Sequence, residues 1–106
     1  MTDFAYLGIS EAAELLRDKK ISPIEYTKAL IGRIEKYDRE LHSFVQFTPE
    51  LALEDARRAE TEIMHGSWRG PLHGVPYGLK DNIDYAGVLT TAQSRILRDN
   101  VVSSDA

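Results

Sequence analysis

Lys80 is the residue of this 106-residue chain whose type and setting point most directly to chemistry. It follows the short apolar run 75–79, and residues 70–84 around it hold three glycines and two prolines. Glycine and proline at this density define the backbone closely, because each is chosen for an unusual φ or a missing hydrogen-bond donor. A lysine at the end of a buried strand is costly unless its amine has a task or a partner, so Lys80 is the first candidate for a catalytic residue. The alternative is a lysine whose ammonium reaches solvent along a buried stem.

Two carboxylates follow the lysine closely. Asp81 and Asp84 are three residues apart, and such a pair could do acid–base work. Polar turn residues after a strand are the favoured interpretation, with Asp84 exposed and Asp81 ordering the loop around the lysine. The pair is therefore not assigned to catalysis.

The remaining polar residues give no metal or nucleotide site. His42, His65 and His73 are far apart and lack metal-ligand spacing, so no zinc site is predicted. His73 is expected to form a hydrogen bond within the loop before the apolar run, and Trp68 to pack on the preceding helix. The evenly spaced glycines of residues 70–78 lack the strand–glycine–helix order of a nucleotide-binding fingerprint.

Composition limits the partners and the compartment. The net charge is −4, and the basic residues are spread along the chain, so nucleic acid is not expected as a direct partner. The chain has no cysteine, which excludes disulfides and cysteine-ligated metals and fits a reducing cytoplasm. The first residues lack the basic and apolar regions of a signal peptide, and no apolar run approaches the length of a membrane span. We therefore expect a cytoplasmic protein without membrane contact.

Three amphipathic helices are expected to precede the lysine segment. Ser10 is predicted to be the N-cap of the first helix. Ser22 is predicted to cap the second, with Pro23 at its first position and Glu25 completing a capping box. A third helix, rich in alanine, is predicted to start after a threonine cap and to run over about residues 49–64.

Short strands are expected beside these helices. Residues 44–47 are rich in strand formers, and residues 75–79 are apolar enough for an inner strand. Pro76 places that second strand at a sheet edge or makes it begin after the proline. Residues 103–105 carry a helix N-cap signal at the end of the sequence. Together with an apolar strand that needs neighbours, this signal predicts a chain cut from a longer protein.

Residues 70–94 resemble the lysine-bearing element of the amidase signature family, which hydrolyses carbon–nitrogen amide bonds. Residues 70–76 are similar to the family's approach to a strand, and Gly78-Leu79-Lys80-Asp81 to the strand end that carries its catalytic lysine. Residues 87–94 are similar to the turn and threonine-rich loop that follow. The predicted helices and the 44–47 strand are similar to the family's N-terminal region, so the resemblance covers nearly the whole chain in one order.

The resemblance implies a Ser–cis-Ser–Lys triad with Lys80 as its lysine. An uncharged lysine accepts a proton through the bridging serine while the nucleophilic serine attacks the amide carbonyl. Burial would favour the uncharged form of such a lysine. Backbone N–H groups of a loop rich in glycine and serine would stabilise the oxyanion, after which the amine leaves and water hydrolyses the acyl-enzyme.

Neither serine of the triad is assigned in this chain. The family places both in a stretch rich in glycine and serine well downstream of the lysine, whereas this chain has no glycine after Gly87. Gln93 stands where a small residue is expected. Three serines follow the lysine, none in a Gly-Ser-Ser-Gly context: Ser94, Ser103 and Ser104.

The fold that the resemblance implies is α/β, a mixed β-sheet covered by helices. Residues 1–106 would be the N-terminal portion of a single amidase domain, incomplete, with helices 1–3 and the first strands. Its helical region would reach to about residue 64, and its lysine strand and threonine loop would occupy about residues 70–94. The implied function is hydrolysis of a small-molecule amide with Lys80 as general base, with no metal or organic cofactor and with a homodimer possible. The chain alone is expected to be inactive.

Two other functions stay open. The amidotransferase A subunit, which releases ammonia from glutamine for tRNA-dependent transamidation, shares the resemblance, and residues 80–83 are much like its strand end. That function would bring partner subunits. The second is a non-catalytic docking or structural module, which the apolar faces of the first two predicted helices motivate.

Overall fold

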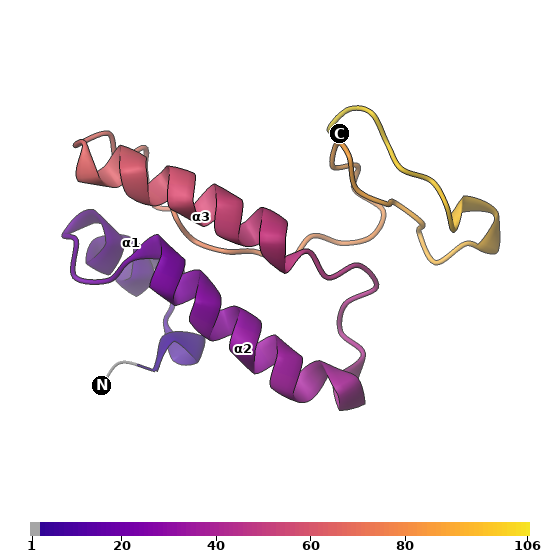
Figure 1. Ribbon diagram of the computed structural model, residues 1–106, viewed down its shortest axis with the longest axis horizontal. Helices are drawn as coiled ribbons and strands as arrows, with labels where there is room; N and C mark the ends of the chain where they lie inside the picture. Colours follow the sequence, from indigo (N-terminus) through magenta and orange to yellow (C-terminus); the bar gives the residue numbers. More distant parts are fainter. Residues whose placement is uncertain (1–2) are drawn as a thin grey trace. The chain divides into compact units, whose positions relative to one another are not determined.

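The computed structural model describes residues 3–106 of the chain. The chain divides into two compact units, one ending at Pro76 and the other spanning Tyr77–Ala106. The first unit is helical, and the second is irregular apart from one short turn of 3-10 helix (Figure 1). The elements in chain order are η1 (Phe4–Tyr6), α1 (Ile9–Arg17), α2 (Pro23–Leu41), α3 (Pro49–Met64) and η2 (Arg95–Leu97).

The start of α2 follows the predicted capping pattern. The Ser22 hydroxyl accepts hydrogen bonds from the backbone N–H groups of Ile24 at 3.1 Å and Glu25 at 3.3 Å, and Pro23 occupies the first turn. Two of the donors that a helix start leaves unpaired are thereby satisfied. The same hydroxyl donates to Oε1 of Glu60 on α3 at 2.6 Å, so the cap also joins α2 to α3.

The starts of the other two helices match the sequence less closely. The prediction of Ser10 as the N-cap of α1 is wrong, because Gly8 precedes the first helical residue and its carbonyl accepts from the Ala12 N–H at 3.0 Å. No side chain caps that start. α3 begins and ends as predicted, although its N-cap residue Thr48 makes no capping hydrogen bond through its side chain.

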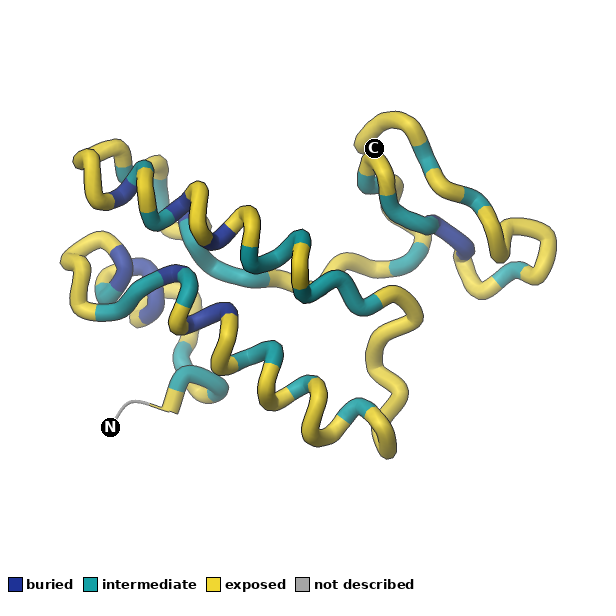
Figure 2. The backbone as a smooth tube through the Cα atoms, in the orientation of Figure 1, coloured by how far each residue is buried: buried dark blue, intermediate teal, exposed yellow. Residues whose placement is uncertain are grey.

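The core of the helical unit lies where α1, the first turns of α2 and the last turns of α3 meet. Ala12, Leu16, Tyr26 and Ile63 form its buried cluster, and Figure 2 shows buried positions gathered there while the second half of α2 is mostly exposed. The alanine-rich face of α3 is buried at Ala56 and Ala59, as its small residues predict. Small side chains at these positions allow neighbouring backbone to approach α3 closely.

Tyr26 is 5% exposed, although helical spacing does not place it on the predicted apolar face of α2. That face consists of Ile24, Thr27, Leu30, Ile31, Ile34 and Tyr37. The ring of Tyr26 lies 5.7 Å from the ring of Phe4 in η1, so an aromatic pair attaches the first residues to the helices. Burial raises the pKa of the Tyr26 hydroxyl, because the charged phenolate would lie among apolar groups.

The two predicted strands are absent from residues 3–106, and this corrects the expectation of β-structure in the chain. Residues 44–47 form a bend between α2 and α3, where the rings of Phe44 and Phe47 contact each other at 5.9 Å. Residues 75–79 have no regular structure. A strand persists only when a neighbour satisfies its backbone N–H and C=O groups, and the described residues give neither segment such a neighbour.

The loop after α3 packs against α1 and α2 at a glycine, Gly74. Gly74 has a φ of +86°, and a Cβ atom on it would lie 3.1 Å from Cγ of Pro23 and 3.4 Å from Cδ1 of Leu16. Both the backbone conformation and the close approach therefore favour glycine here. Val75, the next residue, packs against the core, so the loop that leads to the lysine segment is part of the helical packing.

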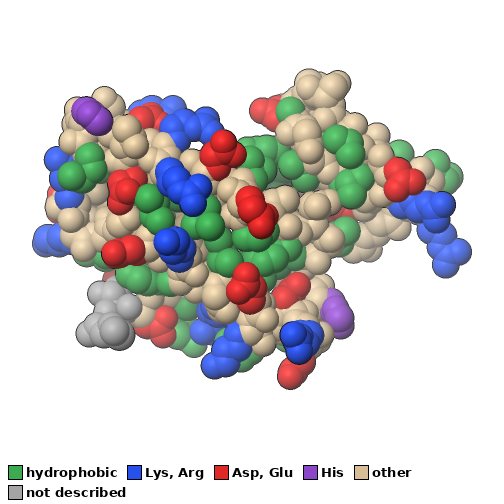
Figure 3. Space-filling view, viewed as in Figure 1, with side chains coloured by type: hydrophobic (Ala, Val, Ile, Leu, Met, Phe, Trp, Pro, Cys, Tyr) green, Lys and Arg blue, Asp and Glu red, His purple; other side chains and the backbone are tan. Residues whose placement is uncertain are grey.

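Charged side chains of both signs are interspersed over the helices, and Figure 3 shows no large field of a single sign on the face it presents. Within residues 3–106, no helix has the length and hydropathy that a membrane crossing requires.

Candidate active site

Lys80 lies in the irregular second unit of the chain and is exposed. Its backbone carbonyl accepts from the Ile83 N–H at 3.0 Å, so the lysine begins a tight turn rather than ending a strand. The burial that an uncharged lysine requires is not provided by residues 77–106 alone. What this unit does provide is a defined backbone around the lysine.

Asp81 makes the hydrogen bonds that define this backbone. Its carboxylate accepts from the Thr91 N–H at 3.0 Å and also from the Thr91 hydroxyl. Its backbone carbonyl accepts from the Ala92 N–H at 2.8 Å. Asp81, the residue next to the lysine, is therefore bonded to the threonine-rich loop ten positions later.

Hydrogen bonds from the Thr91 hydroxyl and backbone, the largest effects, hold the pKa of the Asp81 carboxyl below its usual range. A carboxylate that accepts several N–H and O–H groups is stabilised in its charged form, because protonation would remove acceptors. At neutral pH Asp81 is thus an acceptor and has no proton to give. Asp84 is exposed, and its backbone carbonyl accepts from the Ala106 N–H at 3.0 Å. The favoured interpretation of the two aspartates, one ordering the loop and the other exposed, agrees with this geometry.

The threonine loop has an unusual backbone. Ala92 and Gln93 have φ values of 48° and 59°, the left-handed region that residues other than glycine rarely adopt. The Gln93 N–H donates to Oγ1 of Thr91 at 3.2 Å, so the hydroxyl that contacts Asp81 also supports the left-handed pair.

A short antiparallel contact holds the rest of the unit together. Leu89 and Val101 form a single β-bridge, and the Thr90 N–H donates to the carbonyl of Asn100 at 2.9 Å. The Asn100 side-chain amide donates back to the Thr90 carbonyl at 3.0 Å. Near the end of the sequence, the carboxylate of Asp105 accepts from the Ala86 N–H at 2.8 Å, so this residue of the predicted cap signal supports the turn before the threonine loop.

His73 forms the hydrogen bond that the sequence predicts in the loop before the lysine segment. Its Nδ1 accepts from the Arg69 N–H at 2.9 Å, and its side chain is 4% exposed. An accepting Nδ1 places the proton of the neutral ring on Nε2. That nitrogen lies 3.8 Å from Oε2 of Glu62, beyond hydrogen-bonding distance, and is buried without a partner. Within residues 3–106, no three histidine or acidic side chains gather as a metal site would require.

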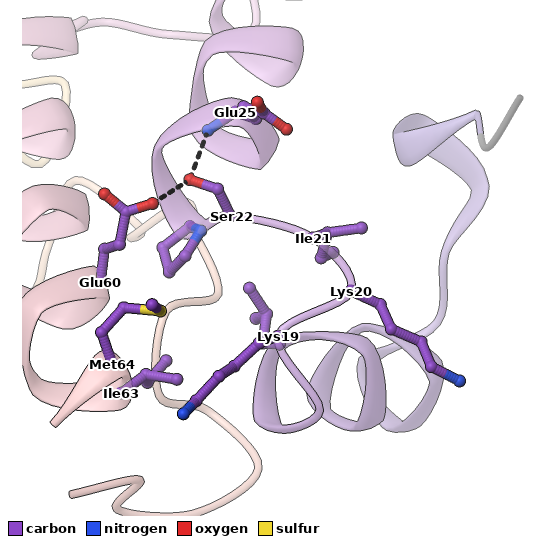
Figure 4. Close-up of a pocket in the computed structure, with 10 residues that line it drawn as sticks. Lys19, Lys20, Ile21, Ser22, Glu25, Glu60, Ile63 and Met64 are labelled. Atoms are coloured by element: carbon purple, nitrogen blue, oxygen red, sulfur yellow. Dashed lines mark hydrogen bonds between the residues drawn. The ribbon is translucent and has the colours of Figure 1, made fainter. Parts of the chain in front are cut away.

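A pocket of about 230 Å³ lies on the helical unit, between the α1–α2 connection and α3. Figure 4 shows Ser22 in its wall, bonded to the Glu25 N–H and to the Glu60 carboxylate. Lys80 does not line this pocket. Ser22 and Glu60 of its lining are engaged in joining α2 to α3.

Thr91 is the residue near Lys80 that the sequence did not single out. Its partner is ten positions away across a turn, and no local spacing rule relates the two residues. The two clues in the sequence were a threonine pair in a loop and a carboxylate beside the lysine, and neither specifies the pairing.

A family model described as Amidase matches residues 25–106 of the chain. The A subunit of glutamyl-tRNA(Gln) amidotransferase from Moorella thermoacetica is 45% identical to it over 101 residues, 95% of the chain. The protein of the same name from Carboxydothermus hydrogenoformans is 40% identical over 101 residues. A putative amidase, AmiD, of Mycobacterium tuberculosis is 38% identical over 100 residues, 94% of the chain.

The matched region is a small part of each of these relatives. The chain spans 21% of the length of each of the three proteins. The match includes α2 from its third residue, α3, Lys80 and the threonine loop.

Proposed function

This chain belongs to the amidase family, and from that premise we propose that it supplies Lys80 as the general base of an amide-hydrolysing enzyme. The observation that carries the proposal is the family match over residues 25–106, which includes Lys80. The geometry of residues 80–93 supports it, because Asp81 and Thr91 give the lysine a defined backbone beside a left-handed loop. Unusual backbone conformations of this kind cluster at functional sites.

In the proposed reaction, Lys80 takes a proton through a bridging serine from a nucleophilic serine. The nucleophile attacks the amide carbonyl, and backbone N–H groups stabilise the oxyanion of the tetrahedral intermediate. The amine takes up the proton and leaves, and water hydrolyses the acyl-enzyme that remains. Both serines would come from outside the residues described here. The same outside residues would cover the exposed lysine.

The intact protein is proposed to have an α/β fold, with residues 1–106 forming part of one amidase domain. Partner strands elsewhere in the domain would satisfy the backbone of residues 75–79, whose apolar composition suits a sheet. The helices α1–α3 would then form one outer layer of the domain.

The test is a lysine variant of the intact protein, assayed by ammonia release from glutamine and from a simple primary amide. Lys80→Ala should lower kcat by at least about 100-fold, which is the contribution expected of a general base. Lys28→Ala, which removes an exposed lysine of α2, is the matched control and should leave kcat unchanged. Retention of hydrolysis by Lys80→Ala, with an unaltered circular dichroism spectrum in both variants, would show that this lysine is not the base.

A second candidate is the amidotransferase A subunit, which the names of the relatives favour. The relatives with that name are 40–45% identical to the chain, against 38% for the putative amidase. Glutamine as the preferred ammonia source, together with copurifying partner subunits, would support this candidate. Hydrolysis of simple amides by a protein that purifies alone would favour a free-standing amidase.

A further inference from the structure

Asp81 connects the lysine to the threonine loop. On one side Asp81 is covalently next to Lys80, and on the other its carboxylate and carbonyl accept three hydrogen bonds from Thr91 and Ala92. A long lysine side chain has several rotatable bonds, so its amine can be placed reproducibly only if its backbone is fixed first. Asp81 is the residue of the second unit that provides this fixation next to the lysine.

The same interactions hold the strained part of the loop. Thr91 donates its hydroxyl to Asp81 and accepts at that oxygen from the Gln93 N–H at 3.2 Å. Gln93 and the preceding Ala92 are the two consecutive residues with left-handed φ. Such a conformation persists only where neighbouring contacts determine it, and here the contacts converge on one hydroxyl and one carboxylate.

A role as proton donor does not fit the contacts of Asp81. Its carboxylate accepts from the Thr91 N–H and hydroxyl, and these contacts favour the charged form, which cannot donate a proton. A purely local turn does not fit either, because a turn after Lys80 requires only the Ile83 N–H bond to the Lys80 carbonyl. The tie to the threonine loop is additional.

We propose that Asp81 is a positioning residue, which acts through the Thr91 hydroxyl to fix the backbone of Lys80 and the left-handed Ala92–Gln93 pair. The inference rests on the proposed function of Lys80 as the base. When the Asp81–Thr91 contact is broken, the lysine loses its fixed anchor and reaches the reactive geometry less often. The chemical step slows while substrate binding, which depends on other residues, changes little.

The experiment compares Thr91→Val, Thr91→Ser, Asp81→Asn and the control Asp84→Asn in the intact protein, with primary-amide hydrolysis as the assay. Valine keeps the shape of threonine and removes the hydroxyl, whereas serine keeps the hydroxyl. Thr91→Val and Asp81→Asn should lower kcat about 10- to 100-fold, the effect expected of a misplaced reacting group, with KM within about twofold. Thr91→Ser should recover kcat to within about threefold of the unmodified protein. Asp84→Asn should behave as the unmodified protein.

Two further measurements separate positioning from general destabilisation. Amide hydrogen exchange at residues 91–93 should become faster in Thr91→Val and stay slow in Thr91→Ser, while the thermal unfolding midpoint of both variants stays within about 4 °C of that of the unmodified protein. Unchanged kcat in Thr91→Val would overturn the proposal. So would a serine variant as slow as the valine variant, or a loss of kcat that follows the fall in Tm.

The failure of this inference is distinguishable from failure of the proposed function. If Lys80→Ala retains hydrolysis, the lysine is not the base and the proposed function is wrong. If Lys80→Ala abolishes hydrolysis while Thr91→Val keeps normal kcat, the function stands and the positioning role of Asp81 is wrong.

Discussion

Gly74 packs so closely on Pro23 that a Cβ atom at position 74 would lie 3.1 Å from Cγ of the proline ring. Pro23 is the first residue of α2, and Gly74 belongs to the loop that leads toward Lys80. The loop is therefore joined to the helices by a contact that any larger residue would disturb. The position of the loop at Gly74 therefore depends on its packing against the first residue of α2.

Gly74→Ala should destabilise the helical unit for two reasons that a control separates. Gly66 also has a positive φ, +84°, but no atom lies within 4 Å of the position its Cβ would take. Gly66→Ala should therefore lose only the conformational term, about 1–2 kcal/mol. Gly74→Ala should lose about 1–3 kcal/mol more, because the methyl group must displace Pro23 or Leu16. If urea unfolding shows equal losses of unfolding free energy in the two variants, Pro23 and Leu16 can move aside without cost and the close contact has no effect on stability.

Ser22→Ala should lower the free energy of unfolding by about 1 kcal/mol for the lost cap alone. The loss should be larger when Glu60 is present, because the serine hydroxyl also donates to its carboxylate at 2.6 Å. In Glu60→Ala the same serine substitution should lose less, and the difference measures the coupling of the two residues. Ser67→Ala, in the exposed loop after α3, is the control. If the losses of the two single variants add up to the loss of the double variant, the Ser22–Glu60 hydrogen bond does not stabilise the packing of α2 on α3.

The loss in free energy of unfolding caused by a substitution of His73 should depend on which ring nitrogen the new side chain imitates. The Arg69 N–H donates to Nδ1, whereas Nε2 has no partner among residues 3–106. His73→Ala leaves that N–H without its acceptor, and the expected loss is about 1–3 kcal/mol. His73→Asn places an amide oxygen near the position of Nδ1 and should lose less, whereas His73→Gln, which imitates Nε2, should resemble alanine. Urea unfolding of the three variants gives the order, and a glutamine variant more stable than asparagine would contradict the assigned acceptor.

The Asp81–Thr91 contact should persist at mildly acidic pH and be lost only in strong acid. The pKa of Asp81 is lowered in the folded chain by the Thr91 hydrogen bonds, so its stabilising effect is fully present above the ordinary carboxyl pKa of about 3.9. It is lost only as the pH falls through the lower folded value. The amide proton signals of Thr91 and Gln93 should therefore titrate with a midpoint below about 3.9. Asp84→Asn should leave this titration unchanged, and Asp81→Asn should remove it.

The helices were predictable from local sequence because their signals are local. Ser22 followed by Pro23 predicted the start of α2, and the alanine-rich run predicted α3 with its correct end at Met64. The start of α1 was missed, since a serine two residues beyond Gly8 carried a stronger cap signal than the glycine itself. Cap preference is a matter of about 1 kcal/mol, and packing of a helix face can outweigh it.

The strands and the contacts of the lysine segment depend on distant residues. Residues 44–47 have a composition suited to a strand, but composition does not supply the neighbouring backbone that a strand requires. Lys80 and Asp81 were singled out from sequence, whereas the bond from Asp81 to Thr91 spans ten positions and follows no periodicity. Tyr26 was missed for a related reason, because it packs on residues outside its own helix, including the ring of Phe4.

The left-handed backbone of Ala92 and Gln93 sets the stability of this loop against its rigidity. Both residues hold a left-handed backbone that glycine adopts without strain, so glycine at either position is a route to a more thermostable protein. The same replacement would let the loop sample conformations that the present residues exclude. A library selected for heat resistance should therefore enrich glycine at these two positions, while a library selected for turnover should reject it.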